Sequence, residues 1–126
     1  MKKIATTKAP AAIGPYSQGM ILGNLVFSSG QIPVVPETGT IAGPTIVEQA
    51  EQSCKNVGEV LKAGGSSYEK VVKTTCFLAD MADFPVFNGI YEKYFVSSPA
   101  RSCVAVKELP KGVLCEIEAI AYLEEE

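Results

Sequence analysis

The sequence of 126 residues predicts an α+β domain of two layers, in which two helices cover one face of a mixed β-sheet. Two observations carry this prediction. Strand-like segments come first and then alternate with two helical segments, and the last strand-like segment has one continuous apolar face. This length suits one domain, which we expect to span residues 1–126.

The first strands and the first helix are marked by local signals. Residues 17–29 hold two apolar runs around a Gly-Asn pair, a pattern that predicts a hairpin. Prolines and glycines over residues 33–44 then indicate a loop. Apolar residues recur at helical spacing from Thr45, whose side chain fits a capping box with Glu48, to the glycines at 64–65.

The second half of the chain alternates strand and helix. Residues 70–79 are rich in β-branched side chains and predict a strand. Asp80 or Asp83 begins the second helix, in which Pro85 is tolerated only near the first turn. Two further strands follow, which we expect at about 101–107 and 114–123.

The last predicted strand has two different faces. One face is apolar and suits packing against helices, and it consists of Cys115, Ile117, Ala119, Ala121 and Leu123. The other face mixes carboxylates with large apolar groups, namely Leu114, Glu116, Glu118, Ile120 and Tyr122. Two helices cannot cover both faces of the sheet. We therefore infer that other copies of the chain cover the second face, with Glu116 and Glu118 in or beside an interface of a homo-oligomer.

Composition disfavours several classes of protein. The net charge is −3 and no run of lysine or arginine forms a basic stripe, so we expect no nucleic-acid partner. No apolar stretch approaches the roughly 20 residues that cross a bilayer, and no signal peptide is recognisable, so we expect a cytoplasmic protein without membrane contact. The four cysteines form no CxxC pair and no histidine is present, which predicts no metal site.

Arg101 is the only arginine of the chain and stands at the start of an apolar, strand-like run. A guanidinium in such a place needs a partner, and its planar fork fits a carboxylate or a phosphate. Two interpretations stay open: a structural ion pair with one of the chain's own glutamates, or a receptor for a small anionic ligand. Cys103 lies two residues further on and is expected on the same face of the strand.

Without histidine, acid–base chemistry near neutral pH falls to a carboxylate, cysteine, tyrosine, lysine or bound water. Glu116 and Glu118 are candidates, and charges paired with lysines at an interface are the alternative. The segments 12–19 and 28–33 contain glycines that let the backbone approach a ligand closely, although each could be an ordinary turn.

Taken together, these segments resemble the RidA family, also called YjgF, of reactive enamine/imine deaminases. The resemblance spans essentially the whole chain and is carried by residues 11–19, 28–33, 72–75, the pair Asn88 and Tyr91, and residues 99–104 and 116–121. It implies a chorismate-mutase-like fold with a mixed six-stranded sheet, two helices on one face and a trimeric inner barrel. Ligand clefts are then expected between the subunits of the homotrimer.

The resemblance also implies an activity. Such enzymes hydrolyse 2-aminoacrylate and 2-aminocrotonate, or their imines, which pyridoxal-phosphate-dependent dehydratases release, to 2-oxo acids and ammonia, and they require no cofactor. Arg101 is then expected to hold the substrate carboxylate, Glu116 to orient the attacking water, and Cys103 to contribute mainly its backbone, with its thiol lining the pocket. The resemblance further implies that Tyr16, Ser29, Gly30 and Asn88 shape and close the cleft.

One departure from the family and two alternative functions accompany this reading. The segment 96–98 is shorter than in some members, which bears on the rim of the cleft. A non-catalytic module that binds small carboxylates and regulates a partner is one alternative. RNA cleavage or inhibition of translation is the other, and the net charge of −3 and the single arginine argue against it.

Overall fold

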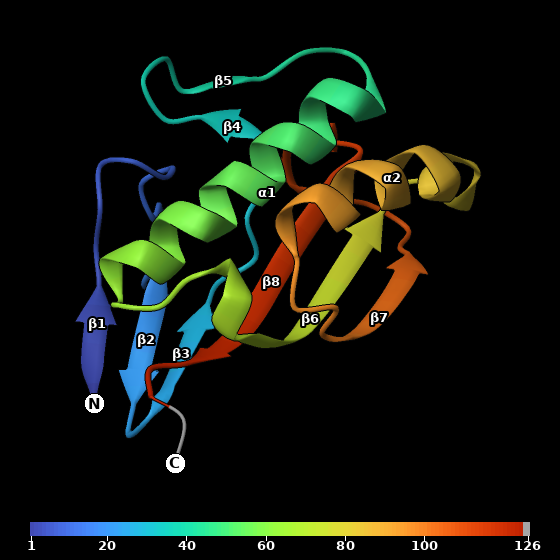
Figure 1. The fold of residues 1–126 in the computed structure, drawn as a ribbon. Helices are drawn as coiled ribbons and strands as arrows, with labels where there is room; N and C mark the ends of the chain where they lie inside the picture. Colours follow the sequence, from blue (N-terminus) through green and yellow to red (C-terminus); the bar gives the residue numbers. More distant parts are fainter. Residues whose placement is uncertain (125–126) are drawn as a thin grey trace.

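The computed structural model describes residues 1–124 and contains a six-stranded sheet with two helices on one face (Figure 1). The strand order is β1-β2-β3-β8-β6-β7; β6 and β7 run parallel, and the other neighbouring strands of this sheet run antiparallel. The mixed sheet and the two-layer α+β fold are therefore confirmed. The strands are β1 (Lys2–Ile4), β2 (Gly19–Leu22), β3 (Leu25–Ser28), β6 (Val71–Leu78), β7 (Ala100–Ala105) and β8 (Cys115–Tyr122).

The helices α1 (Ile46–Ala63) and α2 (Phe84–Tyr94) lie side by side over this face (Figure 1). Three short 3₁₀ turns precede α2 and the strands β6 and β8, at Tyr68–Lys70, Met81–Asp83 and Pro110–Gly112. Pro85 lies in the first turn of α2, as predicted. Neither helix is both long enough and apolar enough to span a bilayer, within the residues that the structure describes.

The predicted capping box of α1 is wrong. Thr45 is the N-cap residue, but its hydroxyl makes no capping hydrogen bond. Glu48 instead directs its carboxylate at the backbone of Gly43, where a Cβ atom would stand 1.5 Å from Oε2. Of the two predicted starts of the second helix, Asp80 caps the preceding 3₁₀ turn by accepting from the amide of Ala82 at 2.8 Å, and α2 follows directly after Asp83.

Two small elements were not expected from the residue patterns. The edge strand β1 buries only Ile4, so its three residues are too few to show an alternation. Within the predicted loop over residues 33–44, β4 (Val34–Val35) and β5 (Thr40–Ile41) pair as a hairpin of two residues each. Strand β1 is held by pairing with β2, and β4 and β5 are held by pairing with each other.

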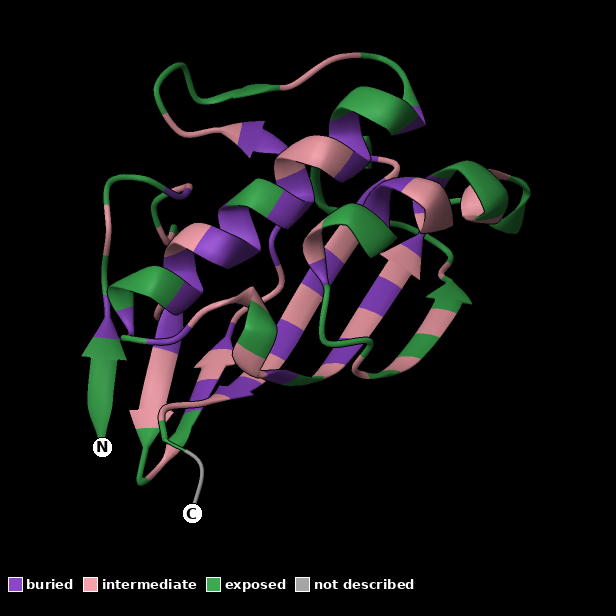
Figure 2. Ribbon diagram, in the orientation of Figure 1, coloured by how far each residue is buried: buried purple, intermediate pink, exposed green. Residues whose placement is uncertain are grey.

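The core lies between the helices and the sheet, and β8 runs through the middle of it (Figure 2). Every second residue of β8, from Cys115 to Ala121, is buried against the helices, which confirms the predicted apolar face. Cys54, Cys76 and Cys115 are fully buried, and burial raises the pKa of each thiol. Within residues 1–124, no helix covers the other face of the sheet, called here the open face, on which Phe27, Phe77, Glu116, Glu118 and Ile120 lie half-buried.

Candidate active site

Arg101 lies on the helix-covered side of the sheet. In the strand register it stands beside Thr74 of β6, which in turn stands beside Ala119 of β8, and both of these neighbours face the core. The Arg101 side chain reaches α2, where its Nη1 donates to Oδ1 of Asn88 at 2.6 Å. Its Cζ also lies 5.3 Å from the ring centre of Phe84 and 4.8 Å from that of Tyr91. We call these four residues the Arg101 cluster: Phe84, Asn88, Tyr91 and Arg101.

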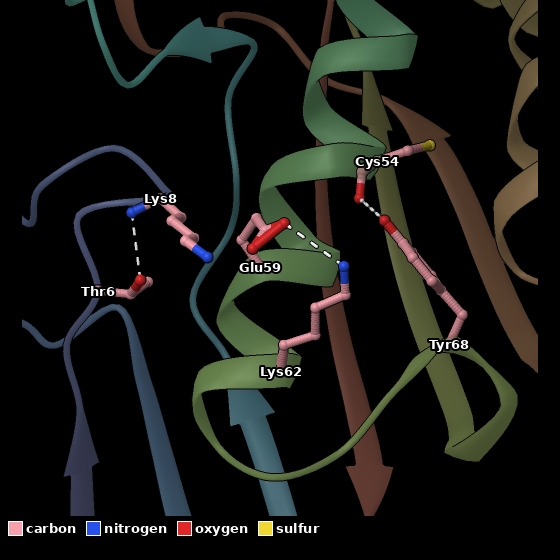
Figure 3. Close-up of polar contacts among 6 residues, drawn as sticks. All are labelled: Thr6, Lys8, Cys54, Glu59, Lys62 and Tyr68. Atoms are coloured by element: carbon pink, nitrogen blue, oxygen red, sulfur yellow. Dashed lines mark hydrogen bonds and ion pairs between the residues drawn. The ribbon is translucent and has the colours of Figure 1, made fainter.

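No carboxylate neutralises this guanidinium within residues 1–124. The one ion pair in that part of the chain joins Glu59 and Lys62 of α1, at 3.6 Å (Figure 3). The interpretation of Arg101 as half of a structural ion pair is therefore wrong for the described chain. Beside the cluster lies a cavity of about 560 Å³, lined by Asn88, Tyr91, Glu92, Phe95, Val96, Ser98, Pro99 and Arg101. The guanidinium thus keeps its charge and most of its donors available next to open space.

Cys103 shares the face of Arg101, as its position two residues further along β7 predicts. Its side chain packs against the core cluster, and burial raises the pKa of the thiol despite the nearby arginine. A thiol in this state is a poor nucleophile, which argues against covalent catalysis by Cys103. Its predicted contribution through the backbone stays a prediction.

Glu116 lies on the open face, between the buried residues Cys115 and Ile117 of β8. It lines a second cavity of about 780 Å³, together with Tyr16, Ser29 and Gly30. We call these four residues the Glu116 cluster. Burial raises the pKa of the Glu116 carboxyl, and the neighbouring charge of Glu118 raises it further. The pKa of this carboxyl is therefore closer to neutral pH than that of an exposed glutamate, which suits a group that takes up and releases protons.

A β-bulge after β3 brings the backbone to Glu116. Phe27 pairs with Ile120 and Gln31 pairs with Ile117, so three residues on one strand oppose two on the other. The hydroxyl of Ser28, inside the bulge, accepts from the amide of Ala119 at 3.0 Å. A Cβ atom on Gly30 would stand 1.9 Å from Oε2 of Glu116, so only glycine fits there without moving the carboxylate.

Two buried polar side chains that sequence reasoning missed hold the walls of the Glu116 cavity. Gln18 accepts from the amide of Thr6 at 2.6 Å and donates to the carbonyl of Pro10 at 2.7 Å, which fixes the segment that precedes Tyr16. Asn56 of α1 donates to the carbonyls of residues 32 and 34, at 3.0 and 2.9 Å. For Asn56 the available signal was a polar residue placed among the apolar positions of a helix. Such a residue needs buried partners.

The two clusters lie on opposite faces of one sheet. Strand β6 separates β7, which carries Arg101, from β8, which carries Glu116. The two side chains are two strand spacings apart, roughly 4.8 Å each, and they point to opposite sides of the sheet. One small molecule cannot contact both. One protomer therefore holds both halves of the predicted site but does not join them. Among residues 1–124, no three metal-ligating side chains of histidine, cysteine, aspartate or glutamate gather in one place.

Comparison with known proteins identifies the family. The model of the family described as Endoribonuclease L-PSP matches residues 6–123, so the chain belongs to this family, the RidA or YjgF family that its motifs resemble. A 2-iminobutanoate/2-iminopropanoate deaminase of Escherichia coli K12 is 51% identical over 124 residues, which cover 95% of this chain and 96% of that protein.

Two further relatives bear on the site. A putative regulator, AldR, of Lactococcus lactis is 54% identical over 122 residues, covering 96% of this chain and 97% of that protein. The crystal structure of Escherichia coli TdcF with bound serine is 47% identical, with a TM-score of 0.93, and the match covers 97% of this chain and 98% of that one. The first relative carries a regulatory name, and the second holds a small amino acid.

Proposed function

We propose that this chain hydrolyses short-lived enamines and imines of 2-oxo acids, with 2-aminoacrylate and 2-aminocrotonate as substrates. Similarity over nearly the full length to several proteins named 2-iminobutanoate/2-iminopropanoate deaminase supports this reaction. The observation within the chain that carries the proposal is Arg101, which faces a cavity and has no acidic partner among the described residues. Such a guanidinium is suited to an anionic ligand.

The Arg101 cluster binds the carboxylate of the substrate. A guanidinium offers five donors, of which one goes to Asn88, so two parallel donors can meet a carboxylate. TdcF binds serine, a molecule with a carboxylate of the same kind, and that supports the assignment. Asn88 accepts from the arginine without neutralising it, so the cluster keeps its attraction for an anion.

The Glu116 cluster carries out the hydrolysis. An enamine first gains a proton on carbon and loses one from nitrogen, which converts it into the imine. Glu116 then takes a proton from water, the water oxygen bonds to the imine carbon, and the C=N electron pair moves to the nitrogen. Glu116 returns the proton to that nitrogen, which gives a carbinolamine. Glu116 then moves the hydroxyl proton to the nitrogen, the C–N bond breaks with its electron pair on nitrogen, and ammonia leaves as the C=O bond forms. One water is consumed and one ammonia released, and the acid–base step contributes roughly 10²–10⁴-fold.

We place the complete site between two copies of the chain. The Arg101 cluster of one copy then faces the Glu116 cavity of the next, and the open face is covered in the assembly. Half-buried Phe27, Phe77 and Ile120 on that face support its burial. A contact between two different surfaces is heterologous, and where its rotation closes it gives a ring, of which a homotrimer is one case.

Mixing two inactive variants tests the shared site. Arg101→Ala and Glu116→Gln chains are each expected to lose turnover of the imine that threonine dehydratase produces from threonine. Co-expressed, they should form mixed trimers in which about one quarter of interfaces join an intact Arg101 to an intact Glu116. Activity should return to about that fraction of wild type. No recovery in mixed trimers of confirmed mass would contradict the inter-subunit site.

Arg101→Lys tests the carboxylate clamp separately. Lysine keeps the charge but cannot make two parallel hydrogen bonds, so turnover should also fail. Near-normal turnover in this variant would show that the clamp is not required.

A regulatory module that binds small carboxylates is the second candidate. The putative regulator AldR, at 54% identity, favours it, and so does the fact that the Arg101 cluster is complete within one protomer. The two functions differ in a simple assay. If the protein binds pyruvate but leaves the decay of the imine signal unchanged, the regulatory function is favoured.

A further inference from the structure

Arg101 is oriented by aromatic rings and not by an acid. Its Cζ lies 4.8 Å from the ring centre of Tyr91 and 5.3 Å from that of Phe84. Phe84, Asn88 and Tyr91 are spaced i, i+4 and i+7, so they form one stripe along α2 that faces the arginine. Aromatic faces attract a cation without cancelling its charge.

Tyr91 itself is fixed on two sides. Its ring stacks on Phe95, with centroids 4.4 Å apart and an interplanar angle of 24°. Its hydroxyl shares a 2.7 Å hydrogen bond with the hydroxyl of Thr74, which is fully buried. Thr74 is the residue of β6 that stands beside Arg101 in the parallel register. The strand that carries the arginine is therefore linked through Thr74 to the ring on which the guanidinium lies.

We propose that Tyr91 is a positioning residue for the substrate carboxylate, which it orients by holding the Arg101 guanidinium on a ring anchored to Thr74. A carboxylate in the place of Tyr91 would hold the arginine equally well but would compete with the ligand. The aromatic contact fixes the fork and leaves its charge for the substrate. This inference rests on the proposed binding of a carboxylate by Arg101.

The test separates binding from turnover. Tyr91→Leu removes the ring, and we expect the KM for the imine and the Kd for pyruvate to rise about 5- to 30-fold, the factor that corresponds to a lost cation–π contact. The kcat should change far less, because Glu116 is untouched. Tyr91→Phe keeps the ring and should restore most of the affinity, which a loss of fold could not explain. Pyruvamide, which lacks the charge, should bind both variants alike.

Tyr94 provides the matched control. It lies on the same helix and its hydroxyl bonds to Glu51, whereas the hydrogen-bond and cation–π partners of the Arg101 side chain within residues 1–124 are Asn88, Phe84 and Tyr91. Tyr94→Phe should therefore leave the Kd for pyruvate unchanged. Thr74→Val should weaken pyruvate binding to the extent that Tyr91→Phe does, and the double variant should be no weaker than either, because both remove the same hydrogen bond.

The outcomes distinguish a failure of the carboxylate clamp from a failure of the positioning role of Tyr91. If Arg101→Ala leaves the Kd for pyruvate unchanged, the proposed carboxylate clamp is wrong. If Arg101→Ala weakens binding but Tyr91→Leu stays within about 2-fold of wild type, less than the weakest cation–π contact would give, the positioning inference is wrong. Should Tyr91→Leu not fold, Phe84→Leu removes the second ring from the same arginine and must show the same rise in KM and Kd.

Discussion

The Arg101 cluster and the Glu116 cluster are built from different kinds of structure. Arg101 comes from a strand and its neighbours from one helix, and every group around it is held by core packing or a hydrogen bond. The Glu116 cavity is lined mostly by the segments around residues 10–18, 29–39 and 110–111, which lie largely outside regular elements. The comparison teaches that the arginine is placed on regular elements, while Glu116, itself on a strand, faces walls made of loops that Gln18 and Asn56 hold by hydrogen bonds.

This difference predicts a division of effects. Changes at the Arg101 cluster should act on binding, and changes at the Glu116 cluster should act on the chemical step. Variants on the Glu116 side test this division.

Glu116→Gln is expected to have the largest effect. Removing the acid–base group should lower kcat by roughly 10²–10⁴-fold with little change in the Kd for pyruvate. Steady-state kinetics and calorimetric titration measure the two quantities. A matching loss of pyruvate affinity would show that Glu116 belongs to the binding half, and the division would fail.

The same variant should become more stable at neutral pH. Because the pKa of Glu116 is raised in the folded chain, the folded state binds its proton more tightly than the unfolded state does. The contribution of this group to stability is therefore lost as the pH rises from the unfolded pKa through the folded pKa. Glu116→Gln removes that loss, so its Tm should exceed that of wild type above this range.

Gly30→Ala should lower kcat by roughly 10²-fold, because a misplacement of about 1 Å at a reacting group has an effect of that size. The added methyl carbon would stand 1.9 Å from Oε2 of Glu116, so the carboxylate must move. Gly89→Ala is the matched control, since a Cβ there meets nothing within 4 Å and no change in kcat is expected. Normal kcat in Gly30→Ala would mean that the observed carboxylate position is not the reactive one.

The sequence predicted the fold more completely than the site. The faces of β8 followed from alternation alone, because a strand with one buried face must place every second residue in the core. Arg101 could be selected because a single guanidinium in an apolar segment needs a partner. The spacing of residues could not predict that these partners are Asn88 and two aromatic rings, because the contact depends on how α2 crosses β7.

Other features of the site could be seen only in the three-dimensional structure. The bulge that brings Gly30 to Glu116 is a mismatch between two strands distant in the sequence, so neither strand shows it. The separation of Arg101 from Glu116 also depends on topology. It arises because β6 lies between β7 and β8, and because the residues beside Arg101 in the register face the core while Glu116 faces away from it.

Glu118→Gln is expected to have the smallest effect. Glu118 lies two residues from Glu116 on the same face of β8, and its negative charge disfavours ionisation of Glu116. Removing that charge lowers the pKa of Glu116, so the rising limb of the pH profile of kcat/KM should move to lower pH. The maximal kcat should hardly change, because Glu118 transfers no proton in the proposed reaction. A shift of this limb to higher pH, or a large loss of kcat at its plateau, would give Glu118 a direct part in the reaction and would enlarge the Glu116 cluster by one residue.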